Sequence, residues 1–553
     1  MRQARRRNCR SVPLDSSEHE ISAKLSQVRG RPILTTGGMK LQELLAGAGA
    51  QGPLVNPEAQ ISSVVYDSRQ AAAGSLFVAI RGEKTDGNRF IAAAVERGAT
   101  AIVSETPPPA QRGQALDAQA QSAQTGKGKI APAAVATSVA WVQVPDARKA
   151  LAIIAANFYG HPADKLQLVG ITGTNGKTTT SFLLDSIIRA AGLRSGLFGT
   201  IEYRTLLETY PAKTTTPESL DLQRFFSEIV RTGGTHAVLE GSSHALALDR
   251  LWGCRFAAAI FSNLTRDHLD FHGTMENYFA AKRRLFEGTG AGPARCGVIN
   301  SDDPYGQQLR NLAGQTITYG LASGAQVTAK KFALALRGLD FIAETPMGKI
   351  EVRSPLVGRN NVYNLLAAIA ASVGLGFQRE SIEFGISALA AVPGRFERID
   401  LGQPFMVVVD YAHTDDALQK LLETARELHP AGRMITLFGC GGERDRAKRP
   451  LMGAAAGRLS DVVVLTSDNP RGEDPLKIIN DALVGLQRTS AKVLVEPDRE
   501  RALELALEQA RPGDMVLLAG KGHETTQVLK DRTIEFDDRE VARRILRERG
   551  YGG

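Results

Sequence analysis

Short apolar runs alternate with stretches of helical periodicity over most of this chain, and this alternation is its most constraining feature. Parallel strands need long crossover connections, usually helices, so the pattern favours parallel sheets covered by helices on both faces. We therefore expect an α/β fold. The predicted strands fall within residues 166–171, 235–240, 256–264 and 296–300, and then within 405–412, 434–442, 461–470 and 514–522.

The chain of 553 residues is too long for one hydrophobic core and predicts several domains. Residues 1–37 show no periodicity and predict a disordered extension. A first α/β domain is expected over 38–159, with a Pro, Ala, Gln and Gly-rich surface insertion near 106–136. A central domain is expected over 160–392, and a C-terminal domain over 393–553.

The stretch "VGITGTNGKTTT" follows the first strand of the central domain and opens a helix. Gly173 and Gly176 let backbone N–H groups approach phosphate oxygens, Lys177 supplies a charge, and Thr178 can offer a hydroxyl to Mg²⁺. The usual phosphate-loop pattern has a glycine where this chain has Ile171. A glycine-rich turn can also occur without a ligand, but the Lys-Thr pair after the second glycine favours a nucleotide site.

Polar residues also follow other predicted strands, where open parallel sheets bind their ligands. Glu240 ends one strand, His268 follows the next, and Lys282 lies on the helix after that. Arg444 and Arg471 follow strands of the C-terminal domain. Each residue has a simpler explanation, such as a helix cap or a surface charge. Their repeated occurrence at strand ends favours a functional site.

Composition narrows the class of protein. The formal charge of +8 is partly due to the first ten residues, "MRQARRRNCR", and the rest is spread along the chain. This distribution fits an enzyme of anionic substrates, so we expect no nucleic-acid partner. The four cysteines show no paired spacing, which favours a reducing compartment, and no apolar run could span a bilayer. We expect a cytoplasmic protein without membrane insertion.

The ordered motifs resemble those of the Mur ligase family, which assembles peptidoglycan precursors. The resemblance runs from about Met39 to the C-terminus. It rests on "GITGTNGKTTT", "TTTPESL", "LEGSSHALALDR", "NLTRDHLDFHGTMENYFAAKRRLF", "GRNNVYNLLAA", "PGRFERI", "DYAHTDDAL", "GCGGERDRAKRPLM", "SDNPRGEDP" and "GKGHETTQ". In this family the phosphate loop has the sequence Gly-Thr-Asn-Gly-Lys-Thr, which accounts for the absence of a glycine at position 171.

The resemblance implies three domains: an N-terminal UDP-binding domain, a central ATP-binding domain with a P-loop-type parallel sheet, and a C-terminal Rossmann-like domain that binds the amino acid. The combination of "DNPR" and "GKGHE" resembles members that add meso-diaminopimelate to UDP-N-acetylmuramoyl-L-Ala-D-Glu. The implied reaction uses ATP and Mg²⁺ and passes through an acyl phosphate. The implied protein is a monomer.

The resemblance also assigns roles to residues of this sequence. The implied catalytic residues are Lys177, Glu240, His268 and Lys282, and the implied metal ligands are Thr178, Glu240, His268 and Lys282, with Lys282 carbamylated to N6-carboxylysine. The implied ATP contacts are Gly173, Thr174, Asn175, Gly176, Lys177, Thr178, Thr179, Asn361, Asp410 and His413. The implied contacts of the UDP-muramoyl dipeptide are Ser68, Arg69, Thr215, Thr216, Ser243 and Arg250. The implied diaminopimelate contacts are Arg444, Asp468, Asn469, Pro470, Arg471, Gly520 and Glu524.

Three positions depart from the family pattern: Gly241 replaces a β-branched residue, Asn360 an aromatic residue or proline, and Asp415 a proline. A glycine next to Glu240 loosens a strand end and puts catalytic efficiency in question. The alternatives are the same reaction with L-lysine, a different Mur ligase, a folylpolyglutamate synthetase and a non-enzymatic scaffold relative.

Overall fold

The structure is a computed structural model that describes residues 38–82, 85–108, 139–322 and 324–552. The predicted extension over 1–37 and most of the predicted insertion near 106–136 lie outside these residues. The chain separates into two compact units, a first unit of residues 1–147 and a second unit of residues 148–553. The boundary between them falls before the end of the predicted first domain, and the three domain boundaries stay predictions.

The first unit is built on a four-stranded parallel sheet in the order β3-β4-β5-β6. Its strands are β3 (Ser63–Val65), β4 (Ser75–Val78), β5 (Ala101–Ser104) and β6 (Ala140–Gln143). Two short antiparallel strands, β1 (Met39–Lys40) and β2 (Gln60–Ile61), flank α2 (Leu41–Leu44). The short helices η1 (Ser68–Gln70), η2 (Gly87–Phe90) and α3 (Ile91–Glu96) complete the described part, and α4 (Ala147–Tyr159) leads into the second unit.

The second unit begins with an eight-stranded sheet in the order β10-β9-β8-β11-β7-β12-β13-β14. The six strands from β8 to β14 in this order are parallel, and β9 and β10 form an antiparallel hairpin whose β9 is antiparallel to β8. The strands are β7 (Gln167–Thr172), β8 (Ser195–Phe198), β9 (Glu202–Arg204), β10 (Thr209–Pro211), β11 (His236–Glu240), β12 (Phe256–Phe261), β13 (Cys296–Asn300) and β14 (Gln315–Tyr319).

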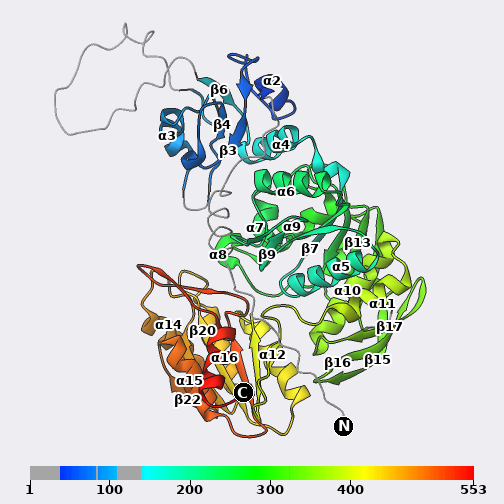
Figure 1. The fold of residues 1–553 in the computed structure, drawn as a ribbon, viewed down its shortest axis with the longest axis vertical. Helices are drawn as coiled ribbons and strands as arrows, with labels where there is room; N and C mark the ends of the chain where they lie inside the picture. The colour runs from blue at the N-terminus through cyan, green and yellow to red at the C-terminus, as the bar shows by residue number, and fades with distance from the viewer. Residues whose placement is uncertain (1–37, 83–84, 109–138, 323, 553) are drawn as a thin grey trace, which may run out of the picture. The chain divides into compact units, whose positions relative to one another are not determined.

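Helices cover both faces of this sheet (Figure 1). One face packs against α5 (Lys177–Ala190) and α10 (Arg359–Leu375), the other against α6 (Ser219–Arg231) and α9 (Met275–Glu287). The helix α10 is buried nearly all round because it also packs against an antiparallel sheet of β15 (Thr328–Ala335), β16 (Gly338–Thr345) and β17 (Gly348–Ser354). The remaining helices are η3 (Pro162–Lys165), α7 (Ser243–Ala247), α8 (Leu269–His272), η4 (Gly306–Leu309) and α11 (Arg379–Ala388).

A six-stranded sheet in the order β18-β19-β23-β20-β21-β22 forms the C-terminal part of the second unit. All its strands are parallel except β18, and helices pack on both faces. Its strands are β18 (Glu397–Ile399), β19 (Met406–Asp410), β20 (Met434–Cys440), β21 (Val462–Ser467), β22 (Lys492–Val495) and β23 (Met515–Ala519). Its helices are α12 (Asp415–Leu428), α13 (Lys448–Leu459), α14 (Pro475–Leu486), α15 (Arg499–Gln509) and α16 (Asp538–Glu548), and β24 (Thr526–Val528) pairs with β25 (Thr533–Glu535).

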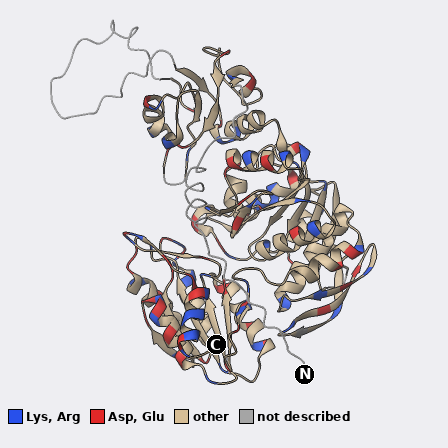
Figure 2. Cartoon of the chain, viewed as in Figure 1, with Lys and Arg blue, Asp and Glu red and all other residues tan. Residues whose placement is uncertain are grey.

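The α/β fold class predicted from the alternation of strands and helices is confirmed. Every predicted strand of the second unit forms, because each apolar run is long enough for one buried parallel strand. Basic and acidic residues are interspersed along the helices of the C-terminal sheet (Figure 2). None of the described helices combines the length and apolar composition that a membrane crossing requires.

Candidate active site

The second unit contains a cavity of about 610 Å³ at the carboxyl ends of its parallel strands. The predicted site residues that line it are Thr174, Asn175, Gly176, Lys177, Thr178, Thr179, Thr215, Glu240, His268, Asn361, Asp410, His413, Arg444, Asp468, Asn469, Arg471, Gly520 and Glu524. The predicted residues of this unit that do not line it are Gly173, Thr216, Ser243, Arg250, Lys282 and Pro470. One cavity therefore brings together most residues predicted for ATP and for the amino acid.

The predicted phosphate loop, residues 173–176, connects β7 to α5, and its backbone conformation depends on its two glycines. Gly173 has a φ of +142°, and a Cβ added to it would stand 1.9 Å from the Ser262 hydroxyl oxygen. Gly176 has a φ of +88°, and a Cβ there would stand 2.3 Å from Oδ1 of Asn364. The helix α5 begins at Lys177, so the loop directs a helix N-terminus at the cavity. This arrangement suits the binding of phosphate.

Lys177 is folded back onto the loop in this structure. Its Nζ donates hydrogen bonds to the carbonyl oxygens of Gly173 at 3.0 Å and Thr174 at 2.8 Å. Burial lowers the pKa of Lys177, while the nearby carboxylates of Glu240 and Asp267 oppose that shift. The cationic form is thus held by carbonyl oxygens and by carboxylates of neighbouring strand ends, and an anionic ligand would stabilise it further.

Glu240 is the last residue of β11, and its side chain is fully buried. Its Oε1 accepts a hydrogen bond from the backbone N–H of Thr200 at 3.0 Å, and its Oε2 accepts one from the Thr200 hydroxyl at 3.0 Å. Both carboxylate oxygens are therefore fixed by one residue that was not among the predicted site residues. A second threonine on the cavity wall, Thr215, lies with its hydroxyl 3.2 Å from that of Thr200.

Gly241 does not need to be a glycine for conformational reasons. It lies outside the left-handed region, and a Cβ there would meet its nearest atoms at 3.7 Å. Its backbone N–H donates to the carbonyl oxygen of Ile171 at 2.8 Å, which ties the end of β11 to β7. The position of the Glu240 carboxylate thus rests on Thr200 and on this backbone contact, whatever side chain stands at position 241.

Lys282 lies on α9 and is buried just behind the loop, with 1% of its surface exposed. Its Nζ donates to the carbonyl oxygen of Gly173 at 2.7 Å, the same oxygen that Lys177 contacts, and lies 4.5 Å from the centre of the Tyr278 ring. In the described chain no carboxylate lies within ion-pair distance of it. Burial, and then the charge of Lys177, lower the pKa of Lys282 well below its ordinary value.

His268 precedes α8 and has a left-handed backbone with a φ of +54°. Its Nε2 lies 3.3 Å from Oδ2 of Asp267, and its ring centre lies 4.8 Å from that of His244. Burial lowers the pKa of His268 well below its ordinary value, which favours the neutral imidazole, while the charge of Asp267 opposes that shift. Two further residues of the cavity wall, Phe396 and Arg471, also adopt positive φ values. Backbone strain of this kind accumulates at functional sites.

The residues predicted for the muramoyl dipeptide are mostly engaged with the protein itself. The Thr216 hydroxyl donates to the carbonyl oxygen of Glu240 at 2.6 Å, and Arg250 donates to the carbonyl oxygen of Thr216 at 3.0 Å. Ser243 is buried, and its hydroxyl has no partner among the described residues. Among these four second-unit residues, only Thr215 lines the cavity.

Ser68 and Arg69, predicted to contact the uridine nucleotide, lie in η1 of the first unit. Ser68 is buried, whereas the Arg69 side chain is 83% exposed and pairs with Asp67 at 2.7 Å. The Asp67 side chain also accepts a hydrogen bond from the Arg69 backbone N–H at 3.0 Å and so begins the short helix. Their role in binding UDP stays a prediction.

The residues predicted for the rest of ATP lie at the start of α10 and after β19. Asn361 donates to the carbonyl oxygen of Val357 at 2.8 Å. Asp410 accepts backbone hydrogen bonds from Phe396 at 2.7 Å and Ala412 at 2.9 Å, while burial raises the pKa of its carboxyl group. His413 is fixed by a contact of 2.9 Å between its Nδ1 and the carbonyl oxygen of Tyr411.

The departures at Asn360 and Asp415 fit their places in the structure. Asp415 is the first residue of α12, behind the capping residue Thr414, whose hydroxyl accepts from the backbone N–H of Ala417 at 3.2 Å. An aspartate at this position interacts favourably with the helix N-terminus, as a proline also fits there. Asn360 lies in the first turn of α10, is exposed and lines the cavity.

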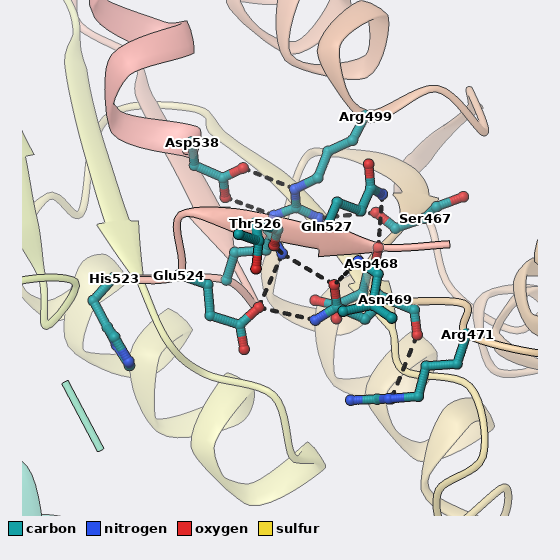
Figure 3. A network of polar contacts seen from close by, with 12 residues as sticks. Ser467, Asp468, Asn469, Arg471, Arg499, His523, Glu524, Thr526, Gln527 and Asp538 are labelled. Carbon is teal, nitrogen blue, oxygen red and sulfur yellow. Dashed lines mark hydrogen bonds and ion pairs between the residues drawn. The ribbon is translucent and has the colours of Figure 1, made fainter. Parts of the chain in front are cut away.

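The residues predicted for diaminopimelate lie at the ends of β20, β21 and β23, and several are linked by hydrogen bonds (Figure 3). Asn469 donates from Nδ2 to Oε2 of Glu524 at 2.9 Å. Arg471 donates from Nη1 to the carbonyl oxygens of Gly442 at 2.7 Å and Asn469 at 3.4 Å. Its Nε and Nη2 contact no acceptor among the described residues. This wall therefore offers both a guanidinium group and a carboxylate.

Arg499 and Asp538, the first residues of α15 and α16, lie behind this wall at the ends of the strands (Figure 3). Both side chains are fully buried and form two hydrogen bonds of 2.8 Å and 2.6 Å. Arg499 also donates to the carbonyl oxygens of Ser467 at 3.2 Å and Ala519 at 3.0 Å, the last residues of β21 and β23. Because β20 separates these two strands, Arg499 joins strand ends that are not paired with each other.

Sequence reasoning missed several residues of the cavity. Arg395, in the "PGRFER" motif, donates to the Thr178 hydroxyl at 3.1 Å, and its guanidinium lies 4.6 Å from the Tyr411 ring centre. Asn364, in "GRNNVYNLLAA", lines the cavity beside Gly176. Both motifs carry the family resemblance, but it assigned no role to these two residues. Thr200 follows no motif, and no signal in the sequence points to it.

Comparisons with known proteins cover nearly the whole chain. The model described as "Mur ligase family, catalytic domain" matches residues 60–159, the "Mur ligase middle domain" matches residues 171–372, and the "Mur ligase, glutamate ligase domain" matches residues 394–522. These three matches lie in the same order as the motifs recognised in the sequence.

Curated relatives match over almost their full length. The UDP-N-acetylmuramoyl-L-alanyl-D-glutamate–2,6-diaminopimelate ligase of Solibacter usitatus is 51% identical over 516 residues, which cover 93% of this chain and 99% of the relative. The ligase of the same name from Geobacter metallireducens is 44% identical over 509 residues, covering 88% and 94%. A solved structure of a ligase with this name aligns with a TM-score of 0.62 at 32% identity, covering 93% of this chain and all of the other.

Proposed function

The chain belongs to the Mur ligase family, and we propose that it joins meso-diaminopimelate to UDP-N-acetylmuramoyl-L-Ala-D-Glu at the expense of ATP. The observation that carries this proposal is that one cavity is lined both by the predicted phosphate loop and by the guanidinium of Arg471 and the carboxylate of Glu524. The former suits a nucleotide. The latter suits an amino acid whose distal end carries both an ammonium and a carboxylate.

The reaction requires two substitutions. A carboxylate does not accept an amine at neutral pH, so an oxygen of the D-Glu γ-carboxylate first attacks the γ-phosphorus of ATP. The bond to the bridging oxygen breaks and ADP leaves. The deprotonated amine of diaminopimelate then attacks the acyl carbon of the acyl phosphate, its C–O bond breaks, and inorganic phosphate leaves. The proton lost by the ammonium passes to solvent.

Residues of the loop stabilise the charge of the transferred group. Backbone N–H groups around Gly176 and the N-terminus of α5 face the cavity. The ammonium of Lys177 exchanges its carbonyl contacts for phosphate oxygens, which compensate its charge better. Arg395, held above Tyr411, lies at the Thr178 hydroxyl and adds a second positive charge on that side.

The residues present fit one Mg²⁺. This ion prefers oxygen ligands and usually takes one or two from the protein, with the rest from phosphates and water. Glu240 and Thr178 offer a carboxylate and a hydroxyl on the cavity wall, and the described residues contain no cluster of three metal-binding side chains. When bound, Mg²⁺ neutralises charge on the phosphates. Thr200 orients Glu240 for that role by holding both of its oxygens.

A second Mg²⁺ near His268 and Lys282 requires that Lys282 be carbamylated. An ammonium at this place repels a cation, whereas a carbamate offers it oxygen ligands. The surroundings of Lys282 favour the modification, because the amine is buried beside another lysine and has no carboxylate partner among the described residues. A neutral amine is the form that attacks CO₂, and burial favours that form. The C–N bond forms and one proton is released.

The test is an assay of phosphate release with purified protein. We expect release only when ATP, UDP-N-acetylmuramoyl-L-Ala-D-Glu and meso-diaminopimelate are all present, with L-lysine a poor substitute. Arg471→Ala should raise the KM for diaminopimelate well over tenfold and leave that for ATP nearly unchanged, because a charge-assisted contact typically contributes about 2 to 5 kcal/mol. Equal use of lysine and diaminopimelate by the wild type would refute the assigned specificity.

The same assay separates the other classes. A scaffold relative would release no phosphate with any amino acid, and a folylpolyglutamate synthetase would not require the muramoyl dipeptide. The presence of Lys177, Glu240, His268 and Lys282 supports an active enzyme. We further propose that the protein acts as a cytoplasmic monomer. Its domains are proposed to span 38–159, 160–392 and 393–553, which bind UDP, ATP and the amino acid respectively.

A further inference from the structure

Lys521 is a fully buried charge that the proposed reaction does not use. It follows Gly520 at the end of β23, and its side chain is 0% exposed. Its Nζ donates to Oε2 of Glu524 at 2.9 Å, to the carbonyl oxygen of Thr526 at 2.7 Å and to Oδ1 of Asn469 at 3.3 Å. An ammonium has three donors, and here each has an acceptor. Glu524 is its only ion-pair partner among the described residues.

The hydrogen bonds around Lys521 place Glu524 and Asn469 in one orientation. Oε2 of Glu524 accepts from both Lys521 and Asn469, whereas its Oε1 accepts from no described residue. The amide oxygen of Asn469 accepts from Lys521 and from the backbone N–H of Val528 at 2.9 Å, so its NH₂ group must face Glu524. Both residues line the cavity. One oxygen of the Glu524 carboxylate is therefore bound to the protein, and the other is left for a ligand.

Hydrogen bonds of one buried arginine connect the two strand ends that carry this group. Lys521 follows the end of β23 and Asn469 the end of β21, and the buried Arg499 donates to the final carbonyl oxygens of both strands. Figure 3 shows Glu524, Asn469 and Arg471 on one side of the network, with Arg499 and Asp538 on the other. The ends of β21 and β23 are thus linked through Arg499. A site that binds both an ammonium and a carboxylate requires its own charged groups to be held in defined positions.

We propose that Lys521 is a positioning residue of the amino-acid site, which turns Oε1 of Glu524 toward the distal ammonium of the incoming amino acid. This proposal rests on the proposed function. Lys521 contacts no substrate itself, because its three donors are already used within the protein. It acts through Glu524 and Asn469 and so contributes to the choice of an amino acid with a distal ammonium.

Two effects of Lys521 on ligand binding oppose each other. Its charge weakens the attraction of Glu524 for an ammonium, but its hydrogen bonds hold the carboxylate in place. The side chain of Glu524 is 29% exposed, so without Lys521 its carboxylate can turn toward water. Exposure also screens the charge effect, whereas the lost orientation is not recovered. We therefore expect positioning to dominate and removal of Lys521 to weaken binding.

The experiment compares Lys521→Met with the wild type on two amino acids. Meso-diaminopimelate carries a distal carboxylate and ammonium, and 2-aminopimelate carries the carboxylate alone. We expect the KM for diaminopimelate to rise about tenfold or more, with KM for 2-aminopimelate and ATP changed less than about threefold. A KM for diaminopimelate that is unchanged or lower would overturn the proposal, as would an equal rise for both amino acids.

A double-mutant cycle tests whether Lys521 acts through Glu524. In the Glu524→Gln background, adding Lys521→Met should change the KM for diaminopimelate less than about threefold, because the positioned carboxylate is already gone. Independent, multiplicative effects would contradict the mechanism. Lys492→Met is the matched control, since Lys492 is an exposed lysine of the same sheet whose ammonium contacts Gln509. This variant should match the wild type on both amino acids.

A measurement on the wild type covers the case in which Lys521→Met does not fold. In a crystal structure with meso-diaminopimelate, Oε1 of Glu524 should contact the distal ammonium while Oε2 stays bound to Lys521. A direct contact between Lys521 and the ligand would overturn the proposal. The proposed function fails separately, if the wild type releases no phosphate with diaminopimelate at all.

Discussion

Removing the buried partner of Arg499 should destabilise the C-terminal sheet strongly. In Asp538→Ala the guanidinium loses two hydrogen bonds, of 2.8 Å and 2.6 Å, at a site where both side chains are 0% exposed. Burial lowers the pKa of Arg499, but the charge and hydrogen bonds of Asp538, together with the charges of Asp468 and Glu524, raise it overall. An arginine does not lose its proton in a protein. The variant therefore keeps a buried, unpaired charge, which costs about 3 to 5 kcal/mol.

A second ion pair between the same two helices provides the control. Glu500 on α15 pairs with Arg544 on α16, and the two side chains are 47% and 45% exposed. Because both charges already face water, Glu500→Ala should cost at most about 1 kcal/mol. The two variants thus remove the same type of contact between the same helices, and they differ in burial.

Native-state hydrogen exchange measured by mass spectrometry suits this comparison, because it reports local stability without requiring two-state unfolding of a large chain. In Asp538→Ala, protection of the amides of β21 and β23 should fall roughly a hundredfold to several thousandfold, at about 1.4 kcal/mol per factor of ten. Glu500→Ala should reduce protection less than about tenfold. Similar losses of amide protection in both variants would refute the argument that burial determines how much the ion pair between Arg499 and Asp538 stabilises the sheet.

Three further outcomes are expected. Lys177→Ala should abolish ligation and leave the melting temperature nearly unchanged, because its charge is used mainly in the transition state; near wild-type amide formation in the folded variant would contradict this. Lys282→Ala should lose most activity, excess bicarbonate should not restore it, a short-chain acid should restore part of it, and wild-type crystals should show extra density on Nζ. Burial lowers the pKa of His236 below its ordinary value of 6.5. Below pH 6.5 the folded chain therefore binds fewer protons than the unfolded chain. The stability that the neutral His236 contributes is complete above pH 6.5 and is lost as the pH falls below it. Native-state hydrogen exchange of the β11 amides, corrected for intrinsic exchange rates and compared at about pH 7.5 and about pH 5, should therefore show a smaller acid loss of protection in His236→Gln than in the wild type. An equal loss would contradict this.

The sequence by itself determined the fold class and the place of the site. Apolar runs such as 235–240 are too short for a buried helix and are flanked by polar strand ends, so a parallel sheet was the consistent interpretation. In such sheets the carboxyl ends of the strands meet at one edge, which is why their positions in the chain suffice to assign Glu240 and Arg471 to a site. The phosphate loop could be predicted because its glycines and Lys177 lie close together in the sequence.

Only the tertiary structure decided which residues hold the site in shape. Lys282 meets the carbonyl oxygen of Gly173 across 109 positions, and Arg395 reaches Thr178 across 217. No local pattern encodes such contacts, because they depend on how separate helices and loops pack around the cavity. Thr200 lies in no recognised motif, yet it fixes both oxygens of Glu240.

The partners of the buried charges beside the C-terminal sheet were likewise decided by the tertiary structure. In the sequence, Arg499 lies at the start of a helix and Lys521 lies in a glycine-rich turn. Basic residues at such positions are usually exposed to solvent. The order of the strands places β20 between β21 and β23, and only this order lets Arg499 join their ends. Periodicity records which face of an element is apolar. The strand order, and with it the partners of a buried charge, follows from long-range packing that one sequence does not reveal.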